Sequence, residues 1–217
     1  TIAVLVGQMG ENSRVSQDNA APGGGGGSFV WIKSNTTTPL IAAGGGAAGS
    51  RTNFAKRHAT ISADGEDSEC IANGGNNGNG GTSNSSSSNS YWAGSGAGWL
   101  TDGTGGNNST DYTYNGSNQG GDGGRKPLNG GTGGTRYSDG SDEGGDGGFG
   151  GGGGGGSDNM GVPGGGGYSG GGGCTSSVSN GGGGGGGSYN SGTNKEDTAE
   201  SNSSHGTVVI KTISASD

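Results

Sequence analysis

Five unbroken glycine runs limit what this chain can fold into. They are Gly23–Gly27, Gly150–Gly156, Gly164–Gly167, Gly170–Gly173 and Gly181–Gly187, and glycine makes up 62 of the 217 residues. A glycine run has no side chain that could be buried, carry a charge or react, so only its backbone N–H and C=O groups can hold it in place. Whether these groups pair with each other or with water decides between an ordered and a disordered chain.

The composition argues against an ordinary globular core. Hydrophobic residues make up 23% of the chain, about half the usual share. Ordering one backbone residue costs about 1–2 kcal/mol, with glycine at the upper end, whereas burying one large apolar side chain contributes about 1.5–3 kcal/mol. Hydrophobic burial alone therefore cannot order the whole chain. Two outcomes remain open: disordered glycine-rich segments, or segments held by backbone hydrogen bonds and a covalent cross-link.

The runs themselves favour a particular ordered form. Collagen is excluded because it needs glycine at every third position and abundant proline, whereas these runs are continuous and the chain has four prolines. The alternative is the polyglycine II helix, which has three residues per turn, a rise of about 3.1 Å and no internal hydrogen bonds. Such helices must bond sideways to neighbours, and bare backbones can approach closely. Continuous runs therefore predict a packed bundle of rods.

Four short apolar segments predict β-strands because they are rich in β-branched and aromatic residues. They are Ile2–Val6, Ser28–Ile32, Pro39–Ala43 and Thr207–Ile213. The first of these is a continuous apolar run and predicts a buried strand. No amphipathic helix pattern of ordinary length occurs between them.

We therefore expect one domain over residues 1–217, mainly β and irregular, with almost no α-helix. Residues 1–46 and 205–217 would form a small β core, and residues 47–204 a polyglycine bundle with glycosylated loops. A chain that leaves a sheet and returns to it after a long excursion is expected to form a single unit.

The order of the blocks along the chain is similar to that in a known extracellular domain. The blocks are Leu5–Gln8, Gly23–Val30, Pro39–Gly46, Gly147–Gly150, Gly164–Cys174, Gly181–Tyr189 and His205–Lys211. In this order they resemble the glycine-rich extracellular domain of the anaplastic lymphoma kinase and leukocyte tyrosine kinase receptors. The resemblance implies a bundle of polyglycine II helices beside a β-sandwich-like module. It also implies a receptor ectodomain, although no stretch of this sequence approaches the ~20 apolar residues of a membrane helix.

Six Asn-x-Ser/Thr sequences predict N-linked glycans and an extracellular or cell-surface location. The acceptors are Asn35, Asn84, Asn107, Asn108, Asn115 and Asn202. Chance could account for some of them, because Asn, Ser and Thr are common in this chain. Asn107 and Asn108 overlap, so one glycan is expected for the two.

The chain has two cysteines, Cys70 and Cys174. In a secreted chain an even pair predicts a disulfide, which would help a protein with so little hydrophobic core. Two free thiols, or pairing with another chain, are the alternatives.

The charged residues give a net charge of −8, which argues against nucleic acid as a partner. The densest acidic segment contains Asp139, Asp142, Glu143 and Asp146, and clustered carboxylates suggest calcium as the one candidate cofactor. The spacing fits no known calcium loop, so a solvated acidic loop is favoured over a metal site.

Catalysis has little support in the sequence. The histidines, His58 and His205, have no Ser/Asp or metal-ligand context, and the glycine runs lack the Gly-Lys-Ser/Thr end of a phosphate loop. We therefore expect a protein that is not an enzyme and has no cofactor or catalytic residue.

Tyr91, Trp92 and Trp99 form the densest aromatic segment. Such residues could contact a ligand or a second subunit, or they could plug the side of the glycine bundle. The plug is favoured.

Three functions stay open. The leading one is a structural or adhesive extracellular scaffold, with itself as partner in a homo-oligomer or surface fibre. The second is a receptor fragment that binds a protein ligand. The third is a disordered glycine-rich matrix protein.

Overall fold

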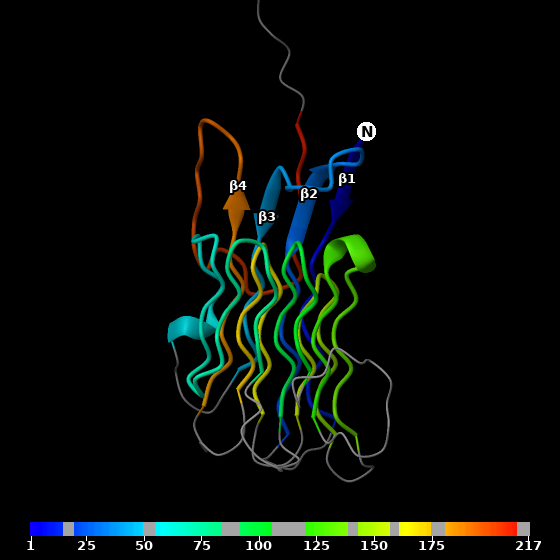
Figure 1. Ribbon diagram of the computed structural model, residues 1–217, viewed down its shortest axis with the longest axis vertical. Helices are drawn as coiled ribbons and strands as arrows, with labels where there is room; N and C mark the ends of the chain where they lie inside the picture. The colour runs from blue at the N-terminus through cyan, green and yellow to red at the C-terminus, as the bar shows by residue number, and fades with distance from the viewer. Residues whose placement is uncertain are drawn as a thin grey trace, which may run out of the picture.

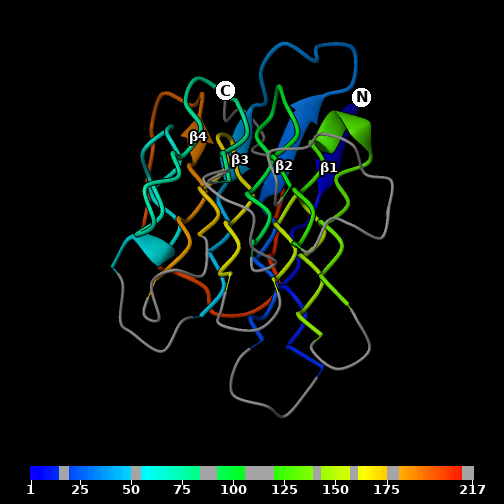
Figure 2. The same cartoon turned by 60° about the horizontal axis from the view of Figure 1, so that its bottom comes forward.

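The fold is mainly β and irregular, as expected. The computed structural model describes residues 1–14, 20–49, 55–83, 92–105, 120–138, 143–156, 161–174 and 181–211. The strands are β1 (Ile2–Leu5), β2 (Ser28–Ile32), β3 (Ile41–Ala43) and β4 (Tyr189–Asn190). In these ranges the helices are the short 3-10 turns η1 (Ala55–Arg57) and η2 (Pro127–Asn129), with no α-helix. Figure 1 shows the strands above a set of extended segments that run side by side, roughly along the strand direction, and Figure 2 shows the same arrangement from below.

The four strands form one antiparallel sheet in the order β1-β2-β3-β4. Its register aligns Leu5 with Phe29, Phe29 with Ala42, and Ala42 with Tyr189. Side chains alternate between the two faces of a strand, so this row lies on one face, which we call the inner face.

The inner face packs on Trp99, which is fully buried. The Trp99 ring lies 5.9 Å from the Phe29 ring and 5.7 Å from the Trp31 ring, measured between centroids. Its indole N–H donates to the backbone carbonyls of Thr36 and Thr37, each at 3.1 Å. The apolar surface of this buried indole thus packs against other rings, and its N–H group is hydrogen-bonded.

Two half-buried tyrosines extend this core. The rings of Tyr168 and Tyr189 stack with their centroids 4.6 Å apart. Burial, with smaller contributions from Tyr189 and Asp64, raises the pKa of the Tyr168 hydroxyl. The stacking joins β4 to the segment that carries two of the glycine runs.

The backbone groups of the glycine runs pair with other segments of the chain. In Gly181–Gly187, four consecutive N–H groups, from Gly184 to Gly187, donate to carbonyls on three different segments. The acceptors, in order, are Gly172, Lys56, Gly45 and Ser169, at 2.8 to 2.9 Å. The first and fourth bonds reach the same neighbouring segment, so the direction of bonding repeats after three residues.

Two other runs show the same repeat. The N–H groups of Gly164 and Gly167 donate to Gly94 and Ala97, while those of the two glycines between them donate to different segments. In the next run the N–H groups of Gly170 and Gly173 donate to Asn79 and Thr82, again on one segment. In these two runs every N–H group donates to another segment, in place of the internal bonds of an ordinary helix.

The segments are so close that a side chain would not fit between them. A Cβ atom on Gly184 would collide with the carbonyl of Glu66, and one on Gly171 with the carbonyl of Gly184. The glycines at the ends of the five runs are all buried. At the turn of Gly150 and Gly151 the backbone also has φ angles of 102° and 85°, which glycine adopts at little cost.

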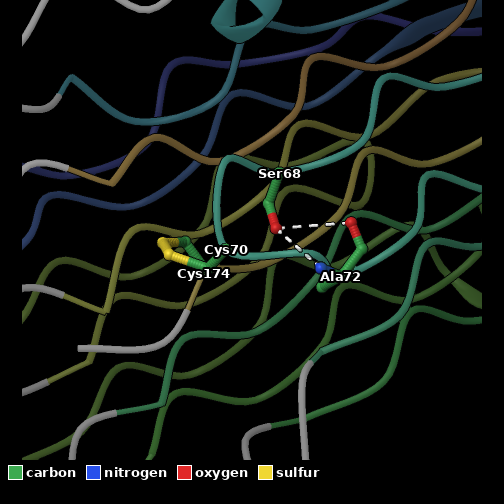
Figure 3. The surroundings of a disulfide bond; sticks show 4 residues. All are labelled: Ser68, Cys70, Ala72 and Cys174. Atoms are coloured by element: carbon green, nitrogen blue, oxygen red, sulfur yellow. Dashed lines mark hydrogen bonds between the residues drawn. A yellow bond between two sulfur atoms is a disulfide. The ribbon is translucent and has the colours of Figure 1, made fainter. Parts of the chain in front are cut away.

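A disulfide joins Cys70 to Cys174, which confirms the predicted pair. Their Cα atoms are 5.0 Å apart, and both cysteines are buried beside Ala48 and Val162. Cys70 lies in a turn that Ser68 closes: the Ser68 hydroxyl accepts from the Ala72 N–H at 3.1 Å and donates to the Ala72 carbonyl at 3.3 Å (Figure 3).

The strand predicted over residues 207–213 is wrong for its described part, Thr207–Lys211, which pairs with no strand. The Gly206 N–H donates to the Gly7 carbonyl at 2.8 Å, and a Cβ atom on Gly206 would meet the Ser28 hydroxyl. Ser28 precedes the inward-facing Phe29, so its side chain points outward. The segment therefore starts over the outer face of the sheet rather than beside an edge, and β4 supplies the fourth strand instead.

The partly buried carboxyl group of Asp122 makes the free energy of unfolding depend on pH. Burial raises the pKa of Asp122 above its ordinary value of 3.8, against opposing effects of Thr135 and Arg125. The folded state then binds this proton more tightly than the unfolded chain, so the stabilising contribution is full below pH 3.8 and is lost as pH rises through the raised pKa. We expect Asp122→Asn to remove this loss. The free energy of unfolding of the variant, relative to the wild type, should rise between pH 3.8 and neutrality. Urea unfolding across this range measures it, and a difference that is constant with pH would contradict the assignment.

Candidate interaction surface

The outer face of the sheet is apolar and largely uncovered. Side chains of β1, β2 and β3 that alternate with the inner row lie on it: Ile2, Val4, Val30, Ile32 and Ile41. Ile2 and Ile41 are each 48% exposed and Val4 is 44% exposed. Exposed apolar patches on a folded protein commonly mark interaction sites. The expectation of a buried strand at Ile2–Val6 therefore holds for the inner face alone.

One edge of β1 is also without a strand partner in the described residues. Strand β1 is the first in the sheet order. The Lys33 N–H donates to the Thr1 carbonyl at 3.0 Å, and antiparallel pairing alternates along a strand. Ala3 and Leu5 therefore direct their backbone groups to β2, while Ile2 and Val4 direct theirs to the free edge.

The segment Thr207–Lys211 lies next to this patch. Two contacts hold the residues before it: the Gly206 bond to Gly7, and the Met9 N–H, which donates to Nδ1 of His205 at 3.2 Å. Beyond them Val209 and Ile210 are 71% and 55% exposed. The segment thus adds exposed apolar side chains to the apolar outer face.

A cavity of about 500 Å³ lies beneath the preceding stretch, residues 198–207. Its lining includes glycines such as Gly25 and Gly45, the polar residues Thr198 and Asn202, and the half-buried His58. Among the described residues, no group of three or more His, Cys, Asp or Glu side chains could hold a metal ion.

Two members of the acidic segment lie around an arginine. Arg136 Nη1 is 2.8 Å from a carboxylate oxygen of Asp146, and its Nη2 is 3.5 Å from one of Glu143. These carboxylates already have a cationic partner. Asp139 and Asp142, the other candidate calcium ligands, lie outside the described residues.

Two of the predicted glycan acceptors, Asn35 and Asn202, are in exposed segments, which is where attachment requires them. The other acceptors fall outside the described part of the chain: Asn84, Asn107, Asn108 and Asn115.

The burial of two aromatic residues favours the packing role over the contact role. Trp99 is fully buried and Trp92 is 9% exposed, and Trp99 packs against the sheet. Tyr91 lies outside the described residues. Sequence reasoning missed the outer face, although the alternation of side chains in β1 and β2 was the signal for it.

Known proteins supply no further identification. No protein-family model, no curated protein and no solved structure matches this chain. In its described part, no helix has the length and apolar character needed to cross a bilayer.

Proposed function

We propose that this chain is a non-enzymatic extracellular scaffold module that assembles with copies of itself into a surface fibre. The observation that carries the proposal is the lateral bonding of the glycine runs, in which consecutive N–H groups donate to different neighbouring segments. A bundle held in this way is stiff because each segment is bonded on several sides.

The three-residue repeat supports polyglycine II helices as the form of these segments. A helix with three residues per turn directs residues i and i+3 to the same side. The N–H groups of Gly184 and Gly187 follow this rule, since both donate to residues 169–172, and so do those of Gly164 and Gly167, which donate to residues 94–97. The sequence resemblance to the glycine-rich domain of the two kinase receptors supports the same assignment.

An extracellular location fits the covalent features. A buried disulfide joins segments 104 residues apart in sequence, and disulfides persist in oxidising compartments. The exposed acceptors Asn35 and Asn202 fit a glycosylated surface. A folded scaffold of this kind would carry its specificity on exposed surfaces, because the buried glycine backbone offers no side chains.

Two measurements on the intact, oxidised protein test the proposal. We expect the amide protons of Gly184, Gly185 and Gly186 to exchange as slowly as global unfolding allows, which a disordered matrix protein would not show. We also expect sedimentation velocity to show oligomers that grow with concentration. A receptor fragment would instead stay monomeric until its ligand is added, and either rapid exchange or a persistent monomer would overturn the corresponding part of the proposal.

A further inference from the structure

We infer that the free edge of β1 binds the segment Thr207–Lys211 of a second copy of this chain, which adds a fifth strand to the sheet. The inference rests on the proposed self-assembly and names the interface through which it occurs.

The accepting edge has the properties of a strand that is normally covered. Natural edge strands usually carry a lysine, a proline or a bulge that prevents pairing with another chain. Strand β1, with the sequence Ile-Ala-Val-Leu, has none of these. The groups that it offers are the outward-directed N–H and C=O of Ile2 and Val4, beside two half-exposed apolar side chains.

The donating segment has the complementary properties. Four of its five residues, Thr207, Val208, Val209 and Ile210, are β-branched, which is the composition that favours strands. Its backbone N–H groups bond to no backbone carbonyl of a described residue. In a strand, Val208 and Ile210 would lie on one face, where they could pair with Ile2 and Val4 across the new ladder.

The added strand must come from a second copy, because the start of the segment is held away from the β1 edge of its own sheet. The bond from Gly206 to Gly7 and the contact of Gly206 with Ser28 place the start of the segment over the outer face of its own sheet. An added strand must lie in the plane of the sheet, which this anchor does not allow for its own β1.

Donor and acceptor are different surfaces of the molecule, so the contact is heterologous. Each copy that receives a segment still offers its own, and such contacts continue into open chains unless the rotation closes a ring. This is the symmetry that a fibre requires.

The experiment compares the full chain with three variants by sedimentation velocity over a hundredfold concentration range. Val4→Lys places a charge at the accepting edge. Ile41→Lys is the matched control, because Ile41 is 48% exposed and Val4 is 44% exposed on the same face, but Ile41 belongs to the interior strand β3. A chain ending at Gly206 lacks the donor. Near-ultraviolet circular dichroism and thermal unfolding verify that each variant is folded.

We expect Val4→Lys and the shortened chain to need at least tenfold higher concentration to assemble, and Ile41→Lys to assemble like the wild type. The shortened chain should also stop growth at one end of an assembly when mixed with the wild type, because it accepts a segment but donates none, and the assemblies should become shorter. Equal loss in Val4→Lys and Ile41→Lys would mean that faces pack together, and would overturn strand addition. If the shortened chain assembled like the wild type, the segment Thr207–Lys211 could not be the added strand. If the wild type assembles and no variant changes this, the interface is wrong while the scaffold proposal stands; a wild type that stays monomeric throughout refutes both.

Discussion

Replacing Gly184 with alanine should lower the free energy of unfolding by about 3 kcal/mol, the upper end of the usual cost of overpacking. The added methyl group would collide with the carbonyl of Glu66, which is backbone and cannot move aside as a flexible side chain could. The same carbonyl accepts the N–H of Gly172, so a shift that relieves the collision also disturbs a hydrogen bond of the bundle. Valine at this position should cost more. Chemical denaturation of the oxidised protein measures the change.

Gly49→Ala is the control for this prediction. Gly49 is exposed, and a Cβ atom there would meet nothing within 4 Å. Alanine reduces the conformational freedom of the unfolded chain, so we expect no loss of stability and a gain of up to about 1 kcal/mol. If the two alanine variants unfolded alike, close packing of the glycine segments would not be what stabilises the fold.

The strands could be predicted where side chains define them. Ser28–Ile32 coincides with β2, and Ile2–Val6 exceeds β1 by one residue, because β-branched and aromatic residues are bounded there by glycine. The two-residue β4 could not be predicted, since Tyr189 and Asn190 become a strand only by pairing with β3. At Thr207–Lys211 the opposite holds: the propensity is present, but the described chain provides no partner.

The partners of the glycine runs could not be predicted from sequence. Identical residues carry no side-chain pattern that distinguishes one neighbour or register from another. In the structure, two features outside the runs help to set which segments are neighbours. One is the Cys70–Cys174 disulfide, and the other is Trp99, whose backbone N–H donates to the Tyr168 carbonyl at 2.8 Å. The runs could therefore be expected to pack, but not in a specified order.

The exposed outer face of the sheet could not be predicted from the sequence either. An apolar run such as Ile2–Val6 predicts a strand without saying which face meets the core. Trp99 covers one face of the sheet, where it contacts the rings of Phe29 and Trp31, about 70 positions away in the chain. The exposed aliphatic face follows from that long-range contact, which no local pattern reveals.

Removing the disulfide is the second large perturbation. We expect the double variant Cys70→Ala, Cys174→Ala to lose about 4–5 kcal/mol of unfolding free energy, because the bridge restricts a loop of roughly 100 residues in the unfolded chain. The cross-link spans 104 residues, and a chain with 23% hydrophobic residues has little other stabilisation to replace it. Alanine suits the apolar surroundings of Ala48 and Val162, where serine would bury hydroxyl groups.

A reducing agent supplies the matched control for this prediction. It should lower the stability of the wild type to that of the double variant and leave the double variant unchanged, as measured by the same denaturation series. This comparison separates the cross-link from the side chains, since the reduced wild type keeps both cysteines. A loss below about 1 kcal/mol in both experiments would mean that lateral hydrogen bonds alone order the bundle, and that the unfolded chain gains little freedom when the bridge is opened.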